Sequence, residues 1–125
     1  MAWTHIRDFV NQGIETHPVD ASAFLSMPDS GIFETDANRL GYVEICFDGL
    51  SLSGAPTDVT FGVWRFSEGH IDKLLAIKLT AAQRAAPMPT WFPFHGQTLW
   101  LTVDAFGAGT SPTLSGSARC RPIRP

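Results

Sequence analysis

The histidines of this chain are the side chains best suited to acid–base catalysis or metal binding, and they are scattered along it. They are His5, His17, His70 and His95. No two of them have the close spacing of a local metal-binding pair such as H-x-x-x-H. We therefore expect no metal ligands among them, and we expect His95 to be a hydrogen-bonded loop residue.

Carboxylates and glycines give no stronger signal of a chemical site. Asp36-Ala37-Asn38 resembles part of a calcium loop but lacks the glycine and the closing glutamate that such a loop needs. The glycine-containing stretch 107–112 precedes an expected strand, whereas a phosphate-binding loop precedes a helix. No G-x-S-x-G nucleophile motif occurs in the sequence. The sequence thus predicts a protein that is not an enzyme, with no catalytic, cofactor or metal site.

The two cysteines, Cys46 and Cys120, fit neither a zinc site nor a C-x-x-C redox motif. A disulfide would require their strands to be neighbours in space, and we expect free, buried thiols. Residues 1–10 contain no apolar leader, and no apolar run is long enough to span a bilayer. These features predict synthesis in a reducing cytoplasm and no association with a membrane.

Aromatic side chains are the remaining candidates for function. They have three interpretations: a subunit interface, where Trp is enriched, a platform for sugar rings, or core packing. The low charged fraction of 17%, against about a quarter in typical proteins, favours buried subunit interfaces. Three arginines near the C-terminus are either contacts for phosphate or an acidic partner, or a solvated strand end. The predicted interface residues are Trp3, Trp64, Trp91, Phe92, Phe94, Trp100, Arg119 and Arg121.

These residues must be positioned by strands, because alternating apolar residues separated by Gly- and Pro-rich turns recur along the chain. The clearest strands are expected at 41–48, 58–66, 71–79, 97–106 and 113–121, with shorter ones at 14–19, 21–27 and 32–35. A helix is the alternative for 71–79. The helical spacing of Ile6, Phe9 and Val10 favours a short helix or an arm over residues 1–13.

The pattern predicts an all-β fold, an antiparallel β-sandwich over residues 14–125 with the N-terminal arm or short helix before it. A jelly-roll-like strand order is preferred, and an immunoglobulin-like order stays open. The formal net charge of −3 gives no reason to expect nucleic-acid binding.

The half of the chain from about Asp58 onward resembles small β-sandwich proteins of tailed bacteriophage particles. The resemblance lies in Val63-Trp64-Arg65-Phe66, in the strand 97–103, and in the loop and strand 107–116. It implies a decoration, cement or accessory protein that packs on capsid or tail. The expected partners are other copies of the chain, as a trimer or larger homo-oligomer, and major capsid or tail proteins. The expected location is the virion. A carbohydrate-binding or receptor-binding module is the alternative.

Overall fold

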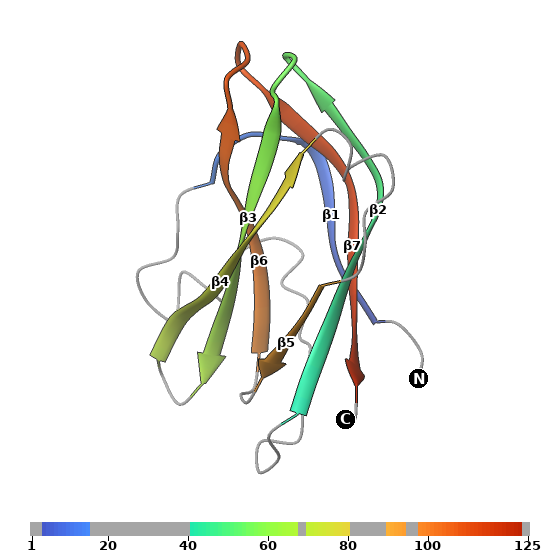
Figure 1. The fold of residues 1–125 in the computed structure, drawn as a ribbon, viewed down its shortest axis with the longest axis vertical. Helices are drawn as coiled ribbons and strands as arrows, with labels where there is room; N and C mark the ends of the chain where they lie inside the picture. The colour runs from blue at the N-terminus through green and yellow to red at the C-terminus, as the bar shows by residue number, and fades with distance from the viewer. Residues whose placement is uncertain (1–3, 16–40, 68–69, 81–89, 95–97, 124–125) are drawn as a thin grey trace.

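The computed structural model describes residues 4–15, 41–67, 70–80, 90–94 and 98–123, and in these residues the regular structure is entirely strand (Figure 1). The strands are β1 (Thr4–Gln12), β2 (Gly41–Ser53), β3 (Asp58–Ser67), β4 (His70–Thr80), β5 (Thr90–Phe94), β6 (Thr98–Gly107) and β7 (Thr113–Ile123). The prediction of an all-β fold is confirmed for the described residues, and the helical alternative for 71–79 is wrong. The short strands expected at 14–19, 21–27 and 32–35 fall almost wholly outside the described residues.

The strands form two antiparallel sheets, one with the order β1-β7-β2-β5 and one with the order β4-β3-β6 (Figure 1). Aromatic rings connect their inner faces. The ring of Phe61 in β3 stacks on Phe47 of β2 at 4.5 Å between centroids and lies 5.6 Å from Phe9 of β1. Burying each such side chain contributes roughly 1.5–3 kcal/mol, so this apolar layer is the main source of stability.

Strand alternation explains which residues enter that layer. In β2, Val43, Ile45 and Phe47 are buried, whereas the residues between them lie on the opposite face. In β7, the inward positions predicted from the sequence, Leu114, Ala118 and Cys120, are all buried. The strongest alternating segments of the sequence are therefore the strands that form the core.

Strand β1 belongs to the four-stranded sheet, so the helix, one of the two alternatives for residues 1–13, is wrong over Thr4–Gln12. Strand β1 pairs with β7, and its register shifts between His5 and Arg7 and again between Phe9 and Gln12. A bulge adds a residue and reverses the alternation of side chains. Both Ile6 and Phe9 are consequently buried although they are three residues apart, a spacing that resembles a helix.

Three antiparallel strand pairs are nested along the chain, and the pairs β2·β7 and β3·β6 complete the two sheets. Strand β3 pairs with β4, β2 with β5, and β1 with β7. The backbone amide of Glu15, which follows β1, donates a hydrogen bond to the carbonyl of Val103 in β6, at 2.9 Å. The chain therefore passes from the four-stranded sheet to the edge of the three-stranded sheet directly after β1.

One end of the two sheets is closed by the β2–β3 and β6–β7 loops, which lie together at the top of Figure 1. The amide of Thr110 donates to the carbonyl of Gly54 at 2.9 Å, and Gly54 has a φ of +84°. A Cβ on Gly54 would lie 2.4 Å from the carbonyl oxygen of Thr110. Only glycine fits this crossing of two backbones. The next residue, Ala55, has a φ of +55°, which strains a residue other than glycine.

We expect Gly54→Ala to lower the free energy of unfolding by more than about 2 kcal/mol, because it adds both a steric clash and backbone strain. Ala55→Gly is the matched control, since it relieves strain at the neighbouring position and should change the stability by less than about 1 kcal/mol. Urea unfolding followed by circular dichroism measures both. Equal losses for the two variants would contradict the strain argument.

Candidate functional site

The outer face of the four-stranded sheet carries two exposed aromatic side chains beside fixed charges. The exposed fraction is 65% for Trp91 in β5 and 40% for Tyr42 in β2. Trp91 pairs directly with Glu44, and Tyr42 precedes Glu44 by two residues on the same face. Trp91 and Tyr42 are thus diagonal neighbours, which in an antiparallel pair lie about 7–8 Å apart and within reach of aromatic side chains.

Charged side chains on this face are paired within the chain. Arg121 in β7 lies opposite Glu44, and its Nη2 is 3.1 Å from Glu44 Oε1. Only 9% of the Glu44 side chain is exposed, so its carboxylate is held in place next to Trp91. The Nε of Arg119 is 3.0 Å from Asp48 Oδ2, and the two residues are about half-exposed. Trp91, Glu44 and Arg121 therefore form one row across β5, β2 and β7, which we call the aromatic row.

The tryptophans among the predicted interface residues differ in how much of their surface is exposed. Trp100 is fully buried, so its side chain offers no surface to a partner, although it pairs with Trp64 on the outer face of the three-stranded sheet. Trp64 is half-buried, and its Nε1 donates a hydrogen bond to Thr102 at 2.9 Å. Trp91 alone among the tryptophans with described side chains is largely exposed. Phe92 and Phe94 are in β5 with Trp91, and Trp3 lies outside the described residues.

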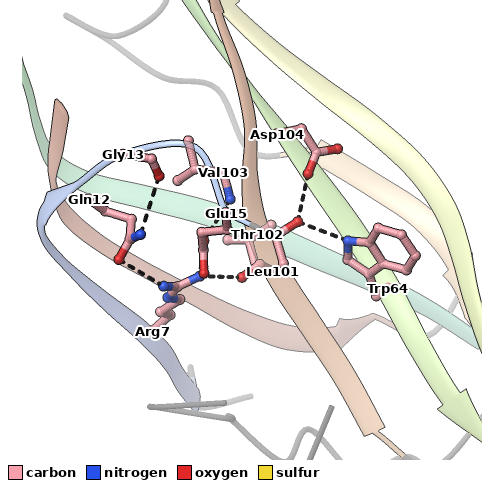
Figure 2. Close-up of polar contacts among 9 residues, drawn as sticks. All are labelled: Arg7, Gln12, Gly13, Glu15, Trp64, Leu101, Thr102, Val103 and Asp104. Carbon is pink, nitrogen blue, oxygen red and sulfur yellow. Dashed lines mark hydrogen bonds and ion pairs between the residues drawn. The ribbon is translucent and has the colours of Figure 1, made fainter. Parts of the chain in front are cut away.

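A second polar cluster lies at the edge where β1 approaches β6 (Figure 2). The Arg7 guanidinium, which is buried, pairs with the Glu15 carboxylate and donates a hydrogen bond to the Leu101 carbonyl at 2.8 Å. The same Glu15 oxygen accepts a hydrogen bond from the Val103 amide at 2.8 Å. The guanidinium carbon of Arg7 lies 4.6 Å from the ring centre of Phe9. We call Arg7 and Glu15 the clasp, because they join the two sheets.

A third cluster lies on the other side of β6, on the outer face of the three-stranded sheet (Figure 2). The Thr102 hydroxyl accepts the hydrogen bond from Trp64 and donates one to Asp104 Oδ1 at 2.7 Å, and Lys73 lies 2.6 Å from Asp104 Oδ2. A Cβ at Gly62 would lie 2.5 Å from Asp104 Oδ2, so glycine leaves the space that the carboxylate occupies. These groups satisfy one another, and we interpret the cluster as structural.

The two cysteines are free, as predicted, although only Cys120 is buried. Their strands are neighbours, but Cys120 pairs with Ile45 whereas Cys46 pairs with Arg119. Adjacent residues of a strand point to opposite faces, so the two sulfur atoms lie on opposite sides of the sheet. Burial raises the pKa of the Cys120 thiol well above its ordinary value.

The described residues contain no cluster of three or more His, Cys, Asp or Glu side chains that could hold a metal ion. Of the histidines, His5 lies on β1, with its Nε2 3.3 Å from Asp8 Oδ2 on an exposed surface. His17, His95 and the carboxylates of Asp29, Glu34 and Asp36 lie outside the described residues.

Sequence reasoning did not identify the clasp, and it did not single out Tyr42 as an exposed neighbour of Trp91. Arg7 lies in the segment expected to be a short helix or an arm, and Glu15 lies in a segment expected to be a short strand. Their contacts with residues 101–103 join distant parts of the chain. Tyr42 had a weak signal, since it occupies the outer face of a strand whose other face is strictly apolar.

No protein-family model, curated protein or solved structure matches this chain in comparisons with known proteins. The resemblance to bacteriophage sandwich proteins therefore stays an expectation. The described part of the chain contains no helix with the length and hydrophobicity that a membrane span requires. The function has to be inferred from the chain's own residues.

Breaking the clasp on one side should destabilise the fold strongly. We expect Glu15→Gln to lower the free energy of unfolding by about 3–5 kcal/mol, because the Arg7 charge would stay buried without its partner. The double variant Arg7→Met/Glu15→Gln removes both charges and should recover part of this loss. Urea unfolding measures each variant.

Asp72→Asn is the matched control, because Asp72 pairs with Arg65 at 2.9 Å on the surface. An exposed pair contributes only about 0–1 kcal/mol. If Glu15→Gln cost no more than Asp72→Asn, the clasp would not hold the sheets together.

The raised pKa of Cys120 makes stability depend on alkaline pH. The folded thiol stays neutral while the unfolded thiol ionises above about pH 8.5, so the unfolded chain binds fewer protons there. This contribution to stability is complete below that pH and declines by about 1.4 kcal/mol per pH unit as the pH rises toward the folded pKa.

The measurement is urea unfolding between about pH 7 and pH 10.5, a range that brackets the pKa of an unfolded thiol. Cys120→Val should flatten the decline relative to the unmodified chain. Cys46→Ser, whose thiol is half-exposed on the outer face, serves as the control and should keep the decline. An unchanged slope in Cys120→Val would show that this thiol ionises freely in the folded protein.

Proposed function

We propose that this chain is a non-catalytic structural protein of a bacteriophage particle, a decoration, cement or accessory protein that packs on capsid or tail by protein–protein contacts. The observation that carries the proposal is the nested order of its strands. We infer from it that the two sheets form a jelly-roll β-sandwich, an architecture used by viral capsid and lectin domains.

The nesting supports a jelly roll because that fold is one long antiparallel hairpin wound into two sheets. Its paired strands therefore nest around the hairpin tip, which here is the β3–β4 pair, with β2·β5 and β1·β7 outside it. Nesting also requires β6 to pair with chain between β1 and β2. Glu15 lies in that interval, and its backbone amide bonds to Val103 of β6.

Exposed aliphatic side chains at the β1 crossover support self-assembly. Val10 and Ile14, which flank the turn from one sheet to the other, are 77% and 64% exposed. A partner that covered these two side chains would remove their apolar surface from water, and such burial favours association. We assign this edge to contacts between copies of the chain, with a trimer or larger ring as the expected form.

The proposed assembly predicts a discrete oligomer when the purified chain is measured by multi-angle light scattering. The double variant Val10→Ser/Ile14→Ser should shift the mass toward the monomer, while circular dichroism shows that the fold is retained, because both side chains are exposed. Trp91→Ala is the control and should leave the mass unchanged. A monomer at every concentration would contradict self-assembly. An unchanged oligomer mass in the double variant would show that the contact between copies does not depend on Val10 and Ile14.

A further inference from the structure

We propose that the outer face of the four-stranded sheet binds an uncharged saccharide at Trp91, Tyr42, Glu44 and Arg121. This inference goes beyond the role in a particle, and it rests on different residues from those assigned to assembly. The inference concerns the ligand that this outer face binds once copies of the chain have assembled.

The aromatic rings supply the first half of such a site. Trp91 is the most exposed tryptophan among those described, and Tyr42 is its diagonal neighbour on the same face. Sugars have apolar C–H faces, which stack on the faces of aromatic rings. Strand β5 is at the end of the sheet order among the described strands, so a ligand can approach Trp91 from the edge.

The carboxylate and the guanidinium supply the second half. Glu44 lies directly opposite Trp91, and its side chain is 9% exposed and held by Arg121 at 3.1 Å. A carboxylate has acceptor sites for several hydrogen bonds and a guanidinium has five N–H donors. Sugar hydroxyls both donate and accept hydrogen bonds, so they match a fixed pair of this kind beside a stacking ring.

The charge of the face favours a neutral ligand. Glu44 pairs with Arg121, Asp48 with Arg119, and His5 lies beside Asp8. The two carboxylate–guanidinium pairs are thus compensated within the chain, so neither an acidic nor a basic partner gains a complementary field beside Trp91. A large protein interface fits less well, because the cores of such interfaces are depleted of charge and bury about 800 Å² on each partner. Here a charged pair lies next to the rings.

The test is isothermal titration calorimetry of the full chain with maltotriose, cellotriose and chitotriose, and with sialyllactose as an acidic probe. We expect binding of at least one neutral trisaccharide and weaker or absent binding of sialyllactose. Trp91→Ala should weaken the binding by about tenfold or more, the loss expected for an aromatic anchor. Trp91→Phe keeps a ring and should retain part of the affinity.

Two further variants separate the parts of the site. Tyr42→Phe keeps the stacking surface and should bind nearly as well as the unmodified chain, whereas Glu44→Gln removes the charged acceptor and should weaken binding. Lys78→Ala, in β4 of the three-stranded sheet, is a surface control that should not change the affinity, because Lys78 is exposed and belongs to neither proposed contact. Circular dichroism confirms that each variant is folded.

The proposal is overturned if no neutral trisaccharide binds, if Trp91→Ala binds as well as the unmodified chain, or if sialyllactose is preferred. It is also overturned if Trp91→Ala dissociates the oligomer, since the face would then be a protein interface. Failure of sugar binding with an intact oligomer would leave the particle role standing. A monomer that binds sugar would support this site and contradict the assembly.

Discussion

The buried ion pair between Arg7 and Glu15 is the interaction on which the arrangement of the two sheets most depends. It lies where the chain leaves the β1-β7-β2-β5 sheet, and it reaches the Leu101 carbonyl and the Val103 amide of β6 in the other sheet. A buried charge is tolerated only when it is paired and hydrogen-bonded. The pair therefore fixes the position of β1, and of the segment after it, relative to β6. Apolar packing between the inner faces gives stability, but it is less directional.

The inner faces of the two sheets pack against each other, and the clasp joins the β1 edge to β6. The outer faces are therefore the surfaces left for function. The outer face of the three-stranded sheet is occupied by the mutually bonded Trp64, Thr102 and Asp104. The outer face of the four-stranded sheet differs, because Trp91 is exposed there beside the held Glu44 carboxylate. We therefore propose two separate roles: the Val10 and Ile14 edge for contact between copies, and the aromatic row for a ligand.

Much of the fold follows from alternation in the sequence, because β2 over residues 43–47 and β6 over residues 99–103 carry apolar side chains on one face. Alternation failed at β1, where bulges bring Ile6 and Phe9 to the same side and resemble a helical repeat. Alternation placed Trp100 correctly on the face opposite Leu101, where it pairs with Trp64, but it did not indicate that this side chain is buried there. The clasp was not predictable, because nothing local in the sequence indicates a contact with residues far along the chain.

The central claim is that Trp91 stays exposed to solvent while copies of the chain pack through the opposite edge, at Val10 and Ile14. Acrylamide quenching of tryptophan fluorescence in the assembled protein, compared with Trp91→Phe, tests this most directly. The account predicts that the assembled protein keeps a readily quenched component and that Trp91→Phe loses it. If Trp91→Phe quenched like the unmodified assembly, Trp91 would be shielded there, and the assignment of this face to a ligand would be contradicted.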